Sequence, residues 1–103
     1  MFRRRTGWTL ADASALHAAA PATVRLPSEE ATRALGVGDR VKLHVVPDTG
    51  MAERLWVVLT VVGDPELEGR LASDPAELRG LRAGDPVTFE RRHVLAVGRP
   101  LDG

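Results

Sequence analysis

The sequence contains no cysteine and no tyrosine, and only two tryptophans and two phenylalanines among its 103 residues. Without cysteine, disulfide bonds, thiolate metal ligands and cysteine nucleophiles are excluded. The 14 basic residues balance the 14 acidic ones, so no overall charge favours nucleic acid or an anionic membrane as a partner. No stretch approaches the roughly 18 consecutive apolar residues that a membrane-spanning helix needs. The length and the 44% hydrophobic content instead predict one folded domain.

The N-terminus resembles a signal peptide in part, because the arginines at 3–5 precede an alanine-rich stretch. A signal peptide needs a continuous apolar segment, and Asp12 and His17 interrupt it here. We therefore expect a cytoplasmic protein. Its predicted segments are a flexible N-terminal arm at residues 1–8, a single globular domain at 9–97 and a frayed C-terminal tail at 98–103.

Residues 53–62 form the most hydrophobic stretch of the chain, and glycine-containing turn signals lie on both sides of it. Between Leu55 and Val62 the only polar side chain is Thr60. A short apolar run of this kind is typical of a strand whose two faces are both covered. We therefore expect the central strand of a small sheet here.

The motif Leu-x-x-Gly-Asp-x-Val-x-(Leu/Phe) occurs twice, at residues 35–43 and 81–89. Glycine and aspartate favour a tight turn, and the alternating apolar residues after them favour a strand with one buried face. We expect both copies to lead into strands of the same sheet, at 40–46 and 86–90. Such an arrangement is frequent in SH3-like and other small barrels.

Capping and turn residues indicate the remaining elements. Thr9 or Asp12 can cap a first helix that ends near Ala20, and Ser28 can cap a second, shorter helix. The other predicted elements are an edge strand at 23–26, a return strand at 67–72, one or two helical turns at 74–80 capped by Asp74, and a last strand at 94–97. Together these patterns predict an α+β protein. We expect a small, strongly bent antiparallel sheet or a partly open SH3-like barrel of five to six strands, with an N-terminal helix and short helical turns.

Several of these segments together resemble a known family. The most specific is Glu53-Arg54-Leu55-Trp56-Val57, and the others are residues 26–30, 38–43, 69–75 and 81–89. In this order they look like the YegJ-like family of small bacterial domains of unknown function, over residues 22–97. The chain departs from the family in having Leu55 where such domains often have methionine. The resemblance implies a compact sheet-based domain and brings no established activity.

Residues suited to catalysis or metal binding are few. The three histidines, His17, His44 and His93, are dispersed and lack metal-ligand spacing, so we predict no metal site, no cofactor and partly exposed imidazoles. Glu53 and Asp74 would lie together if their strands pair, and two such carboxylates can act as acid and base. The alternative, which we favour, is that Asp74 caps a helical turn while Glu53 pairs with a surface arginine.

Trp56 is the strongest candidate for a binding residue. Its ring would either be buried in the core or line a groove, and we favour the core. Arg40 and Lys42, on the outward face of their strand, can form a basic patch with Arg91 and Arg92. A nucleic-acid-binding barrel usually adds exposed aromatic residues, and this chain needs at least two of its four, Trp8, Trp56, Phe2 and Phe89, inside.

We therefore expect a non-enzymatic module that binds another protein. This expectation depends on the lack of cofactor motifs, of metal-ligand spacing and of nucleophile motifs. Single-stranded nucleic-acid binding through the basic patch is the alternative, and a small hydrolase or metal enzyme is the third hypothesis.

Overall fold

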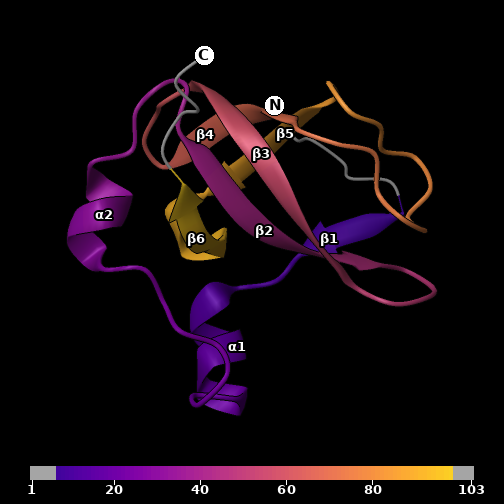
Figure 1. The fold of residues 1–103 in the computed structure, drawn as a ribbon, viewed down its shortest axis with the longest axis horizontal. Helices are drawn as coiled ribbons and strands as arrows, with labels where there is room; N and C mark the ends of the chain where they lie inside the picture. The colour runs from indigo at the N-terminus through magenta and orange to yellow at the C-terminus, as the bar shows by residue number, and fades with distance from the viewer. Residues whose placement is uncertain (1–6, 99–103) are drawn as a thin grey trace.

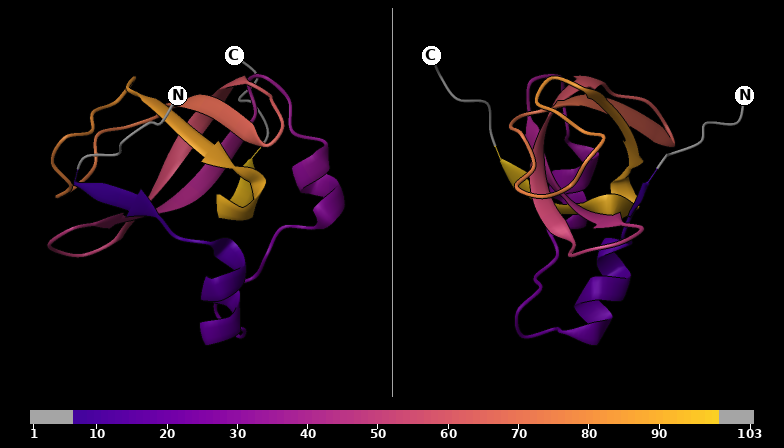
Figure 2. Two further views of the ribbon diagram at one scale, coloured as in Figure 1. Left: turned by 180° about the vertical axis from the view of Figure 1, so that it is seen from behind. Right: turned by 90° about the vertical axis from the view of Figure 1, so that its right-hand side faces the viewer.

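The computed structural model describes residues 7–98, which form one six-stranded antiparallel sheet (Figure 1). The sheet is strongly bent into a nearly closed barrel, as the two views in Figure 2 show. Its strands are β1 (Trp8–Leu10), β2 (Arg40–Pro47), β3 (Glu53–Val61), β4 (Glu66–Leu71), β5 (Pro86–Glu90) and β6 (Val94–Gly98). The predicted α+β class, with a small bent sheet and few helices, is confirmed.

Strand β2 pairs with three other strands. β3 occupies one of its edges along residues 40–45, whereas β6 and β1 share the other edge. On that shared edge β6 pairs with residues 40–43 and β1 with residues 45–47. The sheet order is β1-β2-β3-β4-β5, with β6 beside β2. The last strand thus returns to the first long one, and this pairing closes most of the barrel.

The helices of the described residues are α1 (Ala13–Ala19), α2 (Glu29–Arg33) and the one-turn 3-10 helix η1 (Arg91–His93). Asp12 caps α1, because its carboxylate accepts hydrogen bonds from the N–H groups of Ser14 and Ala15 at 2.8 and 3.2 Å. Ser28 caps α2 by accepting a 3.0 Å bond from the N–H of Ala31. Both predicted caps are confirmed, and α1 projects from one side of the barrel (Figure 1).

The core fills the interior of the barrel. Side chains alternate along β2 and β3, so that Val41, Leu43, Leu55, Val57 and Leu59 are buried. The other strands complete this cluster with Leu67, Leu71, Val87, Phe89 and Val94. A second, smaller cluster joins α1 to the barrel and consists of Ala13, Val24 and Leu95. Since burying one large apolar side chain contributes about 1.5–3 kcal/mol, the barrel interior is the main source of stability.

The two copies of the Leu-x-x-Gly-Asp motif form the same turn. Gly38 and Gly84 adopt a positive φ, of 95° and 88°, which favours glycine. Each glycine N–H donates to a leucine carbonyl on the neighbouring strand, Gly38 to Leu59 at 2.9 Å and Gly84 to Leu71 at 2.7 Å. In return, each leucine N–H donates to the carbonyl of the motif aspartate, at 2.8 and 2.9 Å.

The aspartate side chains close both turns in the same way. Asp39 accepts a hydrogen bond from the N–H of Gly36, and Asp85 accepts one from the N–H of Arg82, both at 2.9 Å. The turns therefore attach β2 to β3 and β5 to β4 at corresponding places. The predicted turn chemistry is confirmed, and the two strands begin at the predicted residues.

The predicted edge strand at 23–26 is wrong, since these residues form no strand. The N–H of Val24 donates to the carbonyl of Ala20 at 2.9 Å, and Nδ1 of His17 donates to the carbonyl of Val24 at 2.6 Å. The end of α1 thus satisfies the backbone groups of Val24 that pairing in a sheet would otherwise satisfy.

The predicted boundary of the N-terminal arm also needs correction. Trp8, which we expected in the arm, begins β1 and is only 8% exposed. Thr9 follows it in the same strand, so Asp12 and not Thr9 is the cap of α1. The remainder of the arm, residues 1–6, and residues 99–103 of the predicted tail lie outside the described residues, whereas Gly98 belongs to β6.

The expectation that both faces of the central strand are covered is wrong for the outer face. Trp56 and Val58 are half-buried, and Thr60 is exposed. At the end of the strand Val61 is 50% exposed. The barrel closes around one face of β3 only, and α1 and α2 do not cover the other.

Candidate functional site

Six side chains project outward from β2 and β3 as three cross-strand pairs. The pairs are Arg40 with Val58, Lys42 with Trp56, and His44 with Arg54. Because the intervening residues of both strands point into the core, these six point to the outer surface. We call the six residues the Trp56 face. Strands β2 and β3 lie at the front of the molecule in Figure 1.

Trp56 lies at the centre of this face and is half-buried. Two cations from β2 lie over its ring, the Arg40 guanidinium at 5.4 Å and the Lys42 ammonium at 4.9 Å from the ring centroid. Such cation–π contacts contribute about 0.5–1 kcal/mol each at exposed sites. The prediction that Trp56 belongs to the core is therefore wrong. Leu55 and Val57 occupy the inward positions, which leaves Trp56 outside.

Arg40 is confined between Trp56 and the backbone of β6. A Cβ atom added to Gly98 would lie 3.4 Å from Cζ3 of Trp56 and 3.5 Å from a terminal nitrogen of Arg40, so glycine leaves room for both side chains. Nε of Arg40 is buried and has no hydrogen-bond partner within the described part of the chain. Among the residues that the structure describes, no ion pair involves Arg40 or Lys42.

His44 and Arg54 form the end of the face nearest the loop between β2 and β3. Nε of Arg54 donates a hydrogen bond to Nδ1 of His44 at 3.3 Å. Partial burial, and then the charge of Arg54, lower the pKa of His44 below its usual value. His44 is therefore neutral at neutral pH. The face carries three positive charges, from Arg40, Lys42 and Arg54, and contains no acidic residue.

Arg91 has a structural role away from the Trp56 face. Its Nε donates to the carbonyl of Thr32 and a terminal nitrogen donates to the carbonyl of Gly63, both at 3.1 Å. It thereby joins the end of α2 to the turn between β3 and β4. Of the predicted basic patch, only Arg40 and Lys42 lie on the Trp56 face, because the Arg92 side chain also binds elsewhere.

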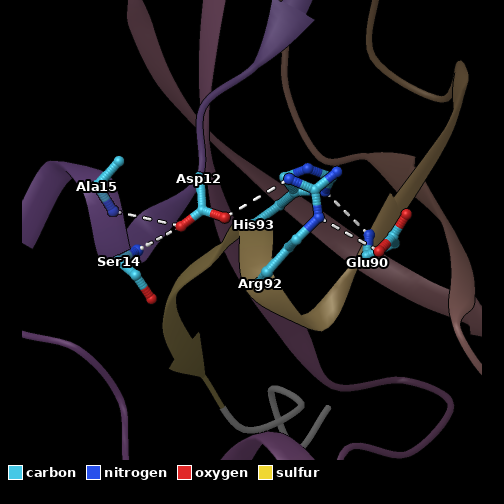
Figure 3. A network of polar contacts seen from close by, with 6 residues as sticks. All are labelled: Asp12, Ser14, Ala15, Glu90, Arg92 and His93. Atoms are coloured by element: carbon cyan, nitrogen blue, oxygen red, sulfur yellow. Dashed lines mark hydrogen bonds and ion pairs between the residues drawn. The ribbon is translucent and has the colours of Figure 1, made fainter.

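Arg92 belongs to a polar network between α1 and η1 (Figure 3). It lies 3.5 Å from a carboxylate oxygen of Asp12 and 3.3 Å from one of Glu90. The N–H of Glu90 donates to Nδ1 of His93 at 3.0 Å. The N–H of Ala15, with a smaller effect of Arg92, holds the pKa of Asp12 below its usual value. His93 is only 4% exposed, so the expectation of a partly exposed imidazole is wrong there.

Glu53 and Asp74 both bind backbone amides of the loop at 72–85. The Glu53 carboxylate accepts hydrogen bonds from three consecutive N–H groups, those of residues 76–78, at 2.6, 3.1 and 2.7 Å. These bonds, above all the one from Leu78, hold the pKa of Glu53 below its usual value. Asp74 accepts a bond from the N–H of Ala83 at 2.9 Å.

Residues 74–80 form no helix. Asp74, the expected cap, binds Ala83 instead, and Glu53 binds the N–H groups that a first helical turn would leave free. The expectations that Asp74 caps a helical turn and that Glu53 pairs with a surface arginine are both wrong. Each carboxylate holds the loop in place, and the acid–base pair gains no support from these contacts.

The described residues contain neither a cluster of metal-binding side chains nor a helix that could cross a membrane. Among residues 7–98 no three histidine, aspartate or glutamate side chains lie close enough to hold a metal ion. No helix in this range has the length and apolar character needed to cross a membrane.

Sequence reasoning found part of the Trp56 face. The alternation that places Arg40 and Lys42 outward also places His44 outward, so His44 could have been found by the same signal. Alternation along β3 also places Arg54 and Val58 on the side of Trp56, but which residues of β2 lie beside them depends on the register of the two strands. Of the other predicted site residues, the structure brings Arg40 to Trp56 and assigns Glu53 and Asp74 to the loop at 72–85.

Comparison with known proteins gives this chain no relative. No protein-family model, no curated protein and no solved structure matches it. The resemblance to the YegJ-like family therefore stays a prediction. The function has to be inferred from the chemistry of the Trp56 face itself.

Proposed function

We propose that this protein is a non-enzymatic binding module built on an SH3-like barrel, and that another protein binds it at the Trp56 face. The order of the strands supports the barrel type. Strands β2 to β5 are neighbours in chain order, and β6 pairs with β2. The single turn of η1 joins β5 directly to β6.

One observation carries the binding proposal: Trp56 is half-buried on the outer surface beside two cations that have no carboxylate partner among the described residues. The main core cluster is formed without Trp56, so packing of the interior does not account for its ring. Tryptophan and arginine are enriched at the positions that dominate binding energy in protein interfaces. A large, fixed ring flanked by available charges suits such a position.

Single-stranded nucleic acid is the second candidate ligand, because the same face combines an aromatic ring with three positive charges. Proteins that bind single strands use both features. One observation weighs against this candidate: Trp8 and Phe89 are buried, which leaves Trp56 as the only tryptophan or phenylalanine side chain at the surface of residues 7–98.

Capture of partners from a lysate of the source cells tests the protein-binding proposal. The tagged wild-type protein is compared with Lys42→Glu and with a matched charge reversal, Arg79→Glu, at an exposed position in the loop at 72–85. We expect a protein that co-purifies with the wild type and with Arg79→Glu, and that is lost from Lys42→Glu. Equal capture by all three proteins would contradict the proposal, and so would capture of nothing by the wild type.

An electrophoretic gel shift with a labelled oligonucleotide tests the second candidate. Phosphate contacts predict binding at low salt that weakens steeply as the ionic strength rises. The absence of any shift at low salt would eliminate nucleic acid as the ligand.

A further inference from the structure

We infer that the protein segment bound at the Trp56 face is acidic and that one of its carboxylates pairs with Arg40. This inference rests on the proposed protein-binding function and specifies the chemistry of the partner. The face carries Arg40, Lys42 and Arg54 and no acidic residue, whereas the outward residues of the neighbouring strand β4 are Glu66, Glu68 and Arg70. Since the formal charge of the whole chain is zero, this surface is a local concentration of positive charge that attracts an acidic segment.

The guanidinium of Arg40 is positioned before any partner binds. The ring of Trp56 lies over it, and the backbone at Gly98 packs beside it. A guanidinium that is already held in place loses less side-chain entropy when it binds a carboxylate through two hydrogen bonds. Charge-assisted pairs of this geometry are among the strongest hydrogen bonds in proteins.

The buried Nε of Arg40 is a second reason to expect an anion at this position. Among residues 7–98 this donor has no acceptor, and such a group costs free energy. A carboxylate placed against the guanidinium stabilises its charge and offsets that cost. Lys42, on the same ring, is placed to receive a second carboxylate of the segment.

Apolar side chains complete the surface around the cations. Val58 pairs with Arg40 across β2 and β3, and Ala96 of β6 pairs with Lys42. Together with Trp56 they offer apolar contact between and beside the charges. A segment that alternates acidic and apolar residues therefore matches the face, because its carboxylates meet Arg40 and Lys42 while its apolar side chains contact Trp56.

An acidic peptide fits this face better than a nucleic acid. Single-strand binding relies on several aromatic rings that stack successive bases. Residues 7–98 present one such ring at the surface, and both neighbouring cations lie against it. The face thus offers concentrated charge beside one ring and no row of stacking positions.

Fluorescence anisotropy with labelled probes tests the inference. One probe is a short fluorescein-labelled peptide of alternating glutamate and leucine, and the matched probe has glutamine in place of every glutamate. We expect the wild-type protein to bind the glutamate peptide at least about tenfold more tightly, because only a carboxylate forms charge-assisted bonds with both cations. Equal affinity for the two peptides would overturn the inference.

Variants of the face locate the binding site. Arg40→Gln should weaken binding of the glutamate peptide by at least about tenfold, whereas Arg79→Gln should leave it unchanged. Circular dichroism and tryptophan emission establish whether each variant is folded. If Arg40→Gln does not fold, Lys42→Gln serves as the second variant, with the same expected direction. Full affinity in a folded Arg40→Gln would overturn the role of Arg40.

An oligothymidylate of similar length separates the two classes of ligand. Tighter binding of this probe than of the glutamate peptide would overturn the acidic segment and favour nucleic acid. Failure of the glutamate peptide to bind at low salt would also overturn the inference. The proposed function would survive that second failure if a captured protein still depended on Lys42, so the two failures are distinguishable.

Discussion

Strand β3 has an inner face that belongs to the core and an outer face that does not. On the inner face Leu55, Val57 and Leu59 are at most 7% exposed. On the outer face Trp56 is half-buried and Thr60 is exposed. The comparison shows that the hydrophobicity of a strand reports how much apolar surface it carries, and not how much of that surface the fold covers. The apolar surface left outside is the part that a partner can use.

The largest difference between the two faces should appear in stability. Leu59→Ala should lower the free energy of unfolding by about 2–5 kcal/mol, because it removes buried methyl groups and leaves a cavity. Thr60→Ala, on the outer face, removes one exposed hydrogen bond to the carbonyl of Glu68 and should lower it by at most about 1 kcal/mol. Urea unfolding followed by circular dichroism measures both values. A similar loss in the two variants would break the distinction between the faces.

The next largest effect concerns the close contact between β3 and β4. Gly69 faces the barrel interior, and a Cβ atom there would lie 2.3 Å from Cγ1 of Val57 and 2.6 Å from the carbonyl oxygen of Val58. Gly69→Ala should therefore cost about 1–3 kcal/mol through overpacking. Gly36→Ala is the matched control, since its Cβ would have no neighbour closer than 3.9 Å. Thermal unfolding measures the stability of both variants. Equal losses of stability would contradict overpacking at Gly69 as the cause.

A smaller loss of stability is expected for the ring on the outer face. Trp56→Ala should lower the free energy of unfolding by only about 1–2 kcal/mol, the sum of two exposed cation–π contacts, while abolishing binding of the acidic peptide. Leu55→Ala changes the inward neighbour of Trp56 and should show the reverse. It should lose more stability, while the protein that remains folded should still bind the peptide. Urea unfolding and peptide anisotropy on the same samples compare the two. A large stability loss in Trp56→Ala would assign the ring to the fold.

The smallest effect is expected at Glu53, which begins the same strand. Its folded-state pKa is lowered by the three amide bonds, so these bonds stabilise the fold while the carboxylate is ionised, above its usual pKa. Their contribution is lost as the pH falls through the lowered pKa. Glu53→Gln should therefore be less stable than the wild type at neutral pH, and the difference should vanish in acid. Hydrogen exchange of residues 76–78 should quicken in the variant, and a difference that grows in acid would contradict this account.

The parts of the fold that depend on near neighbours in the chain could be predicted from the sequence. The Gly-Asp turns and the caps Asp12 and Ser28 use partners within three positions. The loop at 74–80 could not be predicted, because its amides bind Glu53 from another strand. Tertiary contacts of this kind override local helix signals.

The candidate site was predictable to the extent that it follows alternation along one strand. Arg40 and Lys42 lie outward because Val41 and Leu43 lie inward. For Trp56 the signal is weaker, because both faces of its strand carry apolar residues. The polar residues Arg54 and Thr60 lie on the same side of β3 as Trp56, whereas the opposite side is wholly apolar from residue 55 to residue 61, so alternation favours the opposite side as the enclosed one.

The turn at Gly38 has a consequence for the accuracy of strand alignment. A slip of one residue between two strands turns every side chain to the opposite face, which here would send Arg40 and Lys42 toward the interior. The two backbone bonds that join this turn to Leu59 form only in the correct alignment. A slipped pairing would forfeit both of them. The turn at Gly38 lies outside the Trp56 face. Its two bonds to Leu59 nevertheless favour the strand alignment that places Arg40 and Lys42 on the outer surface.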